Sequence, residues 1–99
     1  MATYILLTKL TPEVMSDLKH REKIGKKWMK EVAKKCPEVK WISHYVLLGP
    51  HDFLDIFEAP NEEVAAKVSM ITRSSGALEA ETWTAIPWGR FVELIDETT

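Results

Sequence analysis

Proline and glycine positions divide this chain of 99 residues into short segments, and their spacing limits the fold more than any other feature. The breaks fall at Thr11-Pro12, Pro37, Gly49-Pro50, Pro60-Asn61 and Ser74-Ser75-Gly76. Between the breaks, apolar residues follow a helical spacing in some segments and a strand-like pattern in others. The sequence predicts strands at 2–10, 38–48, 51–59 and 78–86, with helices at 12–36 and 62–73.

The predicted order of elements is βαββαβ. Two strand-helix-strand halves with right-handed crossovers give a ferredoxin-like α+β fold, in which a four-stranded antiparallel sheet has both helices on one face. A chain of 99 residues, 45% of them hydrophobic and 28% charged, has the size and composition of one globular domain. We therefore expect a single domain over residues 1–99.

The predicted strands carry apolar residues on both faces. Tyr4 and Leu6 alternate with Ile5 and Leu7, and Phe53 and Phe57 alternate with Leu54 and Ile56. The helices cover only one face, so the other face also requires burial. This pattern favours a homodimer formed through the open face of the sheet, with a higher oligomer as a further option. The alternative is a monomer in which residues 88–95 fold over that face. In either case we expect the polar end at 96–99 to fray.

The charge balance argues against several classes of partner. Thirteen basic and fifteen acidic residues give a formal charge of -2, which provides no field to attract nucleic acid or an anionic membrane surface. No apolar run approaches the roughly 20 residues that span a bilayer. The single cysteine, Cys36, excludes an internal disulfide and fits the reducing cytoplasm, where we expect the protein to reside.

Two histidines are candidate catalytic residues. His44, in the second predicted strand, either enters an apolar layer and orients a ligand or serves as a core or interface histidine. The sequence leaves open whether His44 or Tyr45 faces the helices, so Tyr45 is a candidate ligand-binding residue as well. His51 and Asp52 follow a Gly-Pro turn, where His51 can act as a general acid or base and Asp52 can bind a ligand. Alternatively, Asp52 caps the turn and His51 is solvated.

Arg21 and Trp28 of the first predicted helix are further candidate ligand-binding residues. Arg21 lies close to the apolar stripe of that helix, where a guanidinium can bind a carboxylate or phosphate, although most helix arginines face water. Trp28 can form a pocket wall for a flat apolar ligand, although packing explains most tryptophans. Asp55 lies between Phe53 and Phe57, and burial of that strand face would raise its pKa.

The sequence predicts neither a metal site nor a cofactor. The three histidines, His20, His44 and His51, lack the short spacings of metal-ligand motifs, and no second cysteine is present. The four glycines do not form a phosphate-binding loop.

Residues 49–88 resemble the GYD domain family, a group of small, largely uncharacterised proteins related in fold to the dimeric α/β barrels. The matching residues are the turn at Gly49, His51 and Asp52, the strand end Glu58-Ala59-Pro60, the acidic helix start at 61–63, and Glu81-Thr82. His51 stands where the family has its name-giving tyrosine, and Cys36-Pro37 replaces a Gly-Gly that often follows the first helix. The resemblance implies a homodimer whose sheets pack face to face, with a pocket between sheet and helices in each subunit.

We expect a homodimeric protein that binds an unidentified small molecule, with Arg21, Trp28, His44, His51 and Asp52 as its main pocket residues. One alternative is a cofactor-independent oxygenase or isomerase of the dimeric α/β barrel superfamily, in which His44 or His51 moves a proton. Another alternative is a regulatory or structural module that binds a further protein through an exposed apolar face.

Overall fold

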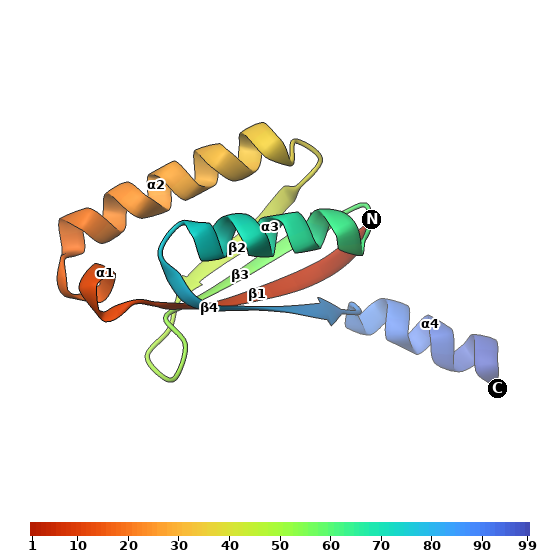
Figure 1. The fold of residues 1–99 in the computed structure, drawn as a ribbon. Helices are drawn as coiled ribbons and strands as arrows, with labels where there is room; N and C mark the ends of the chain where they lie inside the picture. Colours follow the sequence, from red (N-terminus) through yellow and green to blue (C-terminus); the bar gives the residue numbers. More distant parts are fainter.

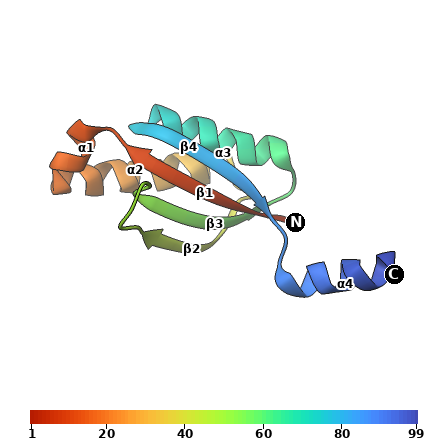
Figure 2. The same ribbon diagram turned by 90° about the horizontal axis from the view of Figure 1, so that it is seen from below.

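A computed structural model describes residues 1–99 and has the predicted ferredoxin-like architecture (Figure 1). Its elements are β1 (Ala2–Leu10), α1 (Pro12–Ser16), α2 (Leu18–Lys35), β2 (Lys40–Val46), β3 (Phe53–Ala59), α3 (Glu62–Ser74), β4 (Ala77–Ala85) and α4 (Trp88–Thr98). The strand pairings are all antiparallel, in the order β2-β3-β1-β4. Helices α2 and α3 lie on one face of the sheet and leave the other face open (Figures 1 and 2).

The core lies between these two helices and the sheet. Leu6 of β1 and Phe57 of β3 belong to one buried cluster with Val32 of α2 and Val68 of α3. Tyr4 stacks on Phe57, with ring centroids 5.5 Å apart. Full burial of a large apolar side chain contributes about 1.5–3 kcal/mol to folding. The apolar face of each helix is therefore fixed against one side of the sheet.

The open face of the sheet is formed by the strand residues that alternate with the core residues. Ile5 and Leu7 of β1 pair with Ile56 and Leu54 of β3, and Ile5 also pairs with Trp83 of β4. Side chains of directly paired residues share a face. Trp83 is 52% exposed. The structure thus confirms that the strands are apolar on both faces.

A register shift in β2 decides which of its residues face the helices. Trp41 pairs with Phe57 and His44 pairs with Asp55, and the register is irregular between these pairs. A bulge of this kind adds one residue to a strand, so Trp41 and His44 both face the helices despite their opposite parity. Tyr45, the next residue, consequently lies on the open face.

The helix predicted over 12–36 is divided at Asp17, so the prediction of one continuous helix is wrong. Asp17 has extended backbone angles, φ -117° and ψ 102°. Its carboxylate accepts a hydrogen bond from the backbone N–H of His20, with an N–O distance of 3.0 Å. An aspartate at this position satisfies an amide that the start of a helix leaves unpaired. Gly25, in contrast, does not interrupt α2.

Both ends of α3 have specific local causes. The side chain of Asn61 accepts a hydrogen bond from the backbone N–H of Val64 at 3.1 Å, which fixes the start of the helix. After the last turn, Gly76 has a φ of 103°. Residues with a side chain rarely adopt this conformation, so glycine allows the chain to turn directly into β4.

Helix α4 extends away from the rest of the chain (Figures 1 and 2). It buries none of its residues. Its apolar stripe is formed by Trp88, Phe91, Val92 and Ile95, each at least 39% exposed. The structure does not realise the alternative in which residues 88–95 fold over the open face. The expected frayed end is also absent, because the helix continues to Thr98.

Candidate functional site

A cavity of about 330 Å³ lies between α2 and the helix-facing side of the sheet. Its lining consists of Thr8, Leu10, Arg21, Ile24, Gly25, Trp28, Met29, His44, Val46, Phe53, Asp55, Thr72, Ser75 and Ala77. These residues come from α2, α3 and all of the strands, so the fold as a whole shapes the cavity. Its volume falls within the range of about 300–1,000 Å³ that is typical of small-molecule sites.

One polar pair lies in the wall of this cavity. His44 Nδ1 and Asp55 Oδ1 are 2.7 Å apart. Asp55 is only 5% exposed. Its burial raises the pKa of the carboxyl group, and the hydrogen bond with His44 opposes this in part. The contact uses Nδ1 of the imidazole, which leaves Nε2 free to meet a bound molecule. An imidazole held in this way can act as a general base, which is the chemical basis of the oxygenase or isomerase alternative.

Trp28 lines the cavity beside the polar pair and packs against Trp41, which is not part of the lining. The ring centroids of Trp28 and Trp41 are 5.1 Å apart, and those of Trp41 and His44 are 5.0 Å apart. The indole N–H of Trp28 donates a hydrogen bond to the hydroxyl oxygen of Thr72 at 2.9 Å. That hydroxyl in turn donates to the carbonyl of Val68 at 2.7 Å. These bonds fix the Trp28 ring, so an entering molecule meets a preformed surface.

Arg21 supplies positive charge to the cavity lining. Its guanidinium lies over the ring of Phe53, 5.6 Å from the ring centroid, in a cation-π contact. No ion pair involves Arg21. Its N–H donors are therefore available to an anionic group on a bound molecule.

Three predicted site residues lie outside the cavity. Tyr45 is on the open face, where it is 55% exposed, because of the register shift in β2. His51 reaches the same face, and its Nε2 is 2.6 Å from Oε2 of Glu81. The carboxylate of Asp52 accepts a hydrogen bond from the backbone N–H of Leu10 at 2.8 Å, so Asp52 holds the turn as the alternative interpretation describes. The other three candidates line the cavity together.

Two further residues of the cavity, Asp55 and Thr72, are not among the predicted site residues. The sequence indicates Asp55, because it is a carboxylate between aromatic residues on one strand face. For Thr72 the sequence indicates only a position in the apolar stripe of α3, and its hydrogen bond to Trp28 joins residues 44 positions apart. Local patterns do not reveal such a partner.

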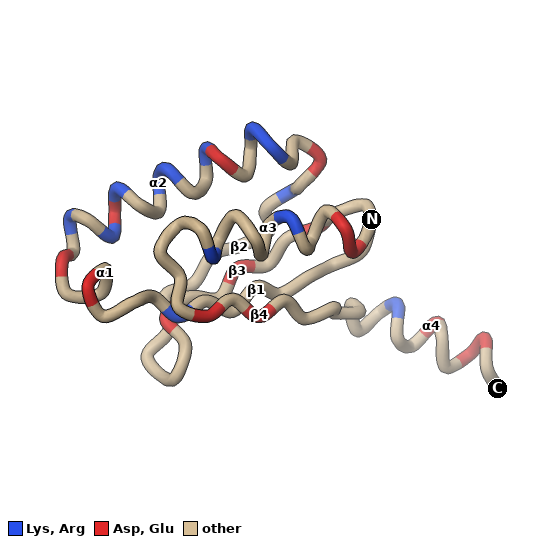
Figure 3. The backbone as a smooth tube through the Cα atoms, in the orientation of Figure 1, with Lys and Arg blue, Asp and Glu red and all other residues tan.

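Charged residues of both signs alternate along α2 (Figure 3). Lys19 and Lys26 pair with Glu22, and Lys35 pairs with Glu31, at N–O distances between 3.1 and 3.6 Å. This interleaving of opposite charges is typical of a solvated helix face. None of the helices has the length and apolar character of a membrane-spanning segment.

Comparisons with known proteins give one similar sequence and several similar folds. A Thermus thermophilus protein named "Glutamine synthetase and cystathionine beta-lyase binding protein" is 32% identical over 91 residues, which cover 88% of this chain and 90% of that protein. The crystal structure of MtbAldR has a TM-score of 0.62 at 16% identity, and the match covers 87% of this chain but only 52% of MtbAldR. The crystal structure of a Thermus thermophilus protein has a TM-score of 0.56 at 21% identity, covering 88% and 95% of the two chains.

The structural matches show the fold, and a family model identifies the family. The model of the GYD domain matches residues 4–95. This span includes nearly all of β1, the other three strands, both helices of the core and most of α4. The chain therefore belongs to the GYD domain family.

Proposed function

We propose that this protein binds a small, largely apolar molecule in the cavity between α2 and the sheet. The proposal rests on one observation: the rings of Trp28 and Phe53 and the polar pair of His44 and Asp55 line one cavity of about 330 Å³. Small-molecule sites are typically apolar clefts with a few convergent polar groups.

The lining favours one chemical class of ligand. A flat ring can stack on the indole of Trp28, which is held in place by Thr72. An acidic or hydroxyl group on that ring can meet His44, and a carboxylate can also be bound by Arg21. The best fit is a planar aromatic or heteroaromatic compound that carries one acidic group.

The proposal includes a homodimer formed through the open face. Tyr45 and Trp83 expose more than half of their surface beside the apolar residues of β1 and β3. Large exposed apolar patches on a sheet face are typical of interfaces. The free thiol of Cys36 agrees with the cytoplasmic location that we retain as part of the proposal.

Filling the cavity tests the proposed binding site. Gly25 lines the cavity, and a Cβ atom at this position would meet no heavy atom within 4 Å. Gly25→Phe therefore introduces a ring at the ligand site, and its Cβ atom meets no clash. Lys27→Phe adds the same side chain at an exposed position of α2 and is the matched control.

Native mass spectrometry of gently purified protein then reports the number of subunits and any retained compound, and a titration with aromatic acids measures affinity. We expect a dimer that binds such a compound in the wild-type and Lys27→Phe proteins but not in the Gly25→Phe protein. Equal binding by both variants, or no binding of any aromatic acid by the wild-type protein, would refute the proposed site.

A second candidate function is binding to another protein through α4. The Thermus relative is named for binding to glutamine synthetase and cystathionine beta-lyase. In the present chain, the apolar stripe of α4 has no partner within the subunit. An amphipathic helix of this kind is suited to a hydrophobic groove on another protein.

A substitution in the stripe tests this second function. Phe91→Ser should weaken binding to glutamine synthetase about tenfold or more, as truncation of an aromatic contact residue typically does. Glu93→Ser, at an exposed position on the polar side of α4, is the control. Biolayer interferometry measures both, and equal affinities for the two variants and the wild-type protein would exclude the stripe as the contact.

A further inference from the structure

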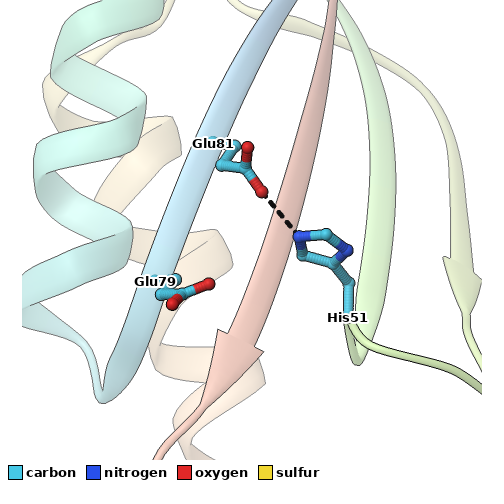
Figure 4. A group of neighbouring side chains, drawn as sticks. All are labelled: His51, Glu79 and Glu81. Atoms are coloured by element: carbon cyan, nitrogen blue, oxygen red, sulfur yellow. Dashed lines mark hydrogen bonds and ion pairs between the residues drawn. The ribbon is translucent and has the colours of Figure 1, made fainter.

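A group of potential metal ligands lies on the open face, on the opposite side of the sheet from the cavity (Figure 4). It consists of His51, which precedes β3, and of Glu79 and Glu81 on β4. One donor atom from each residue lies within 4.8 Å of the donor atoms of the other two. Figure 4 shows Glu81 directed toward His51 across β1, with Glu79 on the same side of β4.

Sheet pairing holds these side chains together. The backbone N–H of Asp52, beside His51, donates to the carbonyl of Thr8 in β1 at 2.8 Å. In β4, Glu79 and Glu81 are two positions apart, so their side chains leave the strand on the same face. The imidazole Nε2 is already 2.6 Å from the Glu81 carboxylate. The backbone therefore brings the ligands close without an added ion.

The two carboxylates have no lysine or arginine partner within ion-pair distance. Lys9 pairs with Glu79 in the strand register, but its ammonium donates to the carbonyl of Pro50 at 3.2 Å. The negative charges of Glu79 and Glu81 repel each other, and His51 contacts only the Glu81 carboxylate. A divalent cation would neutralise this local excess of negative charge.

We propose that His51, Glu79 and Glu81 bind one divalent transition-metal ion, for which Zn²⁺ is the best fit. Imidazole ligands favour Zn²⁺ and its neighbours over Mg²⁺ and Ca²⁺, which prefer oxygen ligands. Ligand bonds of about 2.1 Å place tetrahedral donor atoms roughly 3.4 Å apart. Rotation of the flexible glutamate side chains closes the observed spacing to that value. A fourth position remains for water or for a group from a second chain.

The absence of a metal motif in the sequence has a simple reason. His51 and Glu81 are 30 positions apart and meet only because β3 and β4 both pair with β1. The proposed ion site is independent of the cavity, since the sheet separates the two. A failure of one proposal therefore leaves the other intact.

The experiment titrates the full chain, without an affinity tag and after treatment with EDTA, with ZnCl₂ in an isothermal titration calorimeter. Absorption of bound Co²⁺ then reports the coordination geometry. We expect one ion per chain. His51→Gln and Glu79→Gln should each raise the Kd about 100-fold or more, because loss of groups that only orient a ligand already costs about 10–100-fold.

Two control variants separate this site from other histidines. His20→Gln removes an exposed histidine of α2, and His44→Gln removes the other histidine that contacts a carboxylate. Both should retain wild-type affinity, and circular dichroism checks the fold of every variant. The proposal is overturned if the wild-type protein binds no Zn²⁺, if affinity is lost in His44→Gln instead, or if Glu79→Gln retains full affinity.

Discussion

Asp55 is the residue whose chemistry the fold changes most clearly. Burial raises the pKa of its carboxyl group, and contact with His44 opposes this only in part. In a pH range above the unfolded-state pKa of about 3.9, Asp55 therefore keeps a proton in the folded chain that it has released in the unfolded chain. Within this range, up to the raised folded-state pKa, the free energy of unfolding rises as the pH falls.

Asp55→Asn should remove this part of the pH dependence. Asparagine keeps a hydrogen-bond acceptor for His44 but has no titrating proton. Urea denaturation at a series of pH values above about 3.9 measures the effect. Asp96→Asn, at an exposed position of α4, should keep the wild-type slope. If the Asp55→Asn and wild-type curves run parallel, another group causes the dependence.

Gly76→Ala should lower the free energy of unfolding by about 1–2 kcal/mol, the usual cost of a positive φ for a residue with a side chain. The φ of Gly76 is 103°. A new Cβ atom would lie 3.4 Å from Cγ2 of Val14, which is ordinary contact, so the backbone and not a clash causes the loss. Urea denaturation measures it, and a variant as stable as the wild type would contradict this account.

Helix α2 contains a position where a substitution should make the helix more stable. Gly25→Ala should raise the free energy of unfolding by up to about 1 kcal/mol, because alanine has the higher helix propensity. A Cβ atom at Gly25 meets nothing within 4 Å, so no contact opposes the gain. Gly76→Ala, the same substitution with the opposite expected sign, is the comparison. A lower free energy of unfolding for Gly25→Ala than for the wild-type protein would show that α2 requires glycine at this position.

The order of elements was predictable because proline and glycine mark their ends. Pro37 and Gly49-Pro50 bound β2, and Gly76 separates α3 from β4. The capping role of Asp17 was not predictable, since this residue lies within an otherwise continuous helical pattern. The bulge in β2 was not predictable either, because it depends on how that strand pairs with β3.

The candidate site was predictable only where helical spacing or strand position carried the signal. Arg21 and Trp28 follow from the apolar stripe of α2, and His44 follows from its strand. Tyr45 has the same parity as Trp41, but the bulge places the two on opposite faces. The position of His51 depends on contacts across β1, and no local pattern encodes them.

The single sheet of this protein has two chemically different faces. The helix-facing side holds the cavity with its buried carboxyl group, and the open side holds exposed aromatic residues and the His51–Glu79–Glu81 group. Substitutions on one side should therefore leave binding on the other side unchanged.

Trp83→Glu should convert the proposed dimer into a monomer at micromolar protein concentration. The substitution places a charge among the apolar residues of the open face, where desolvation in an interface is costly. Met70→Glu, on α3 and 68% exposed, puts the same charge on the other side of the molecule and should leave the dimer intact. Sedimentation velocity distinguishes the two states, and a dimeric Trp83→Glu protein would locate the interface elsewhere.

Helix α4 has eleven residues and buries none of them. Isolated helices shorter than about 12–15 residues are only marginally stable in water. A molecule that lies against its apolar stripe would therefore stabilise the helical form of α4. If α4 binds the proposed partner, we expect proteolysis within α4 to slow when that partner is added, and limited proteolysis measures this.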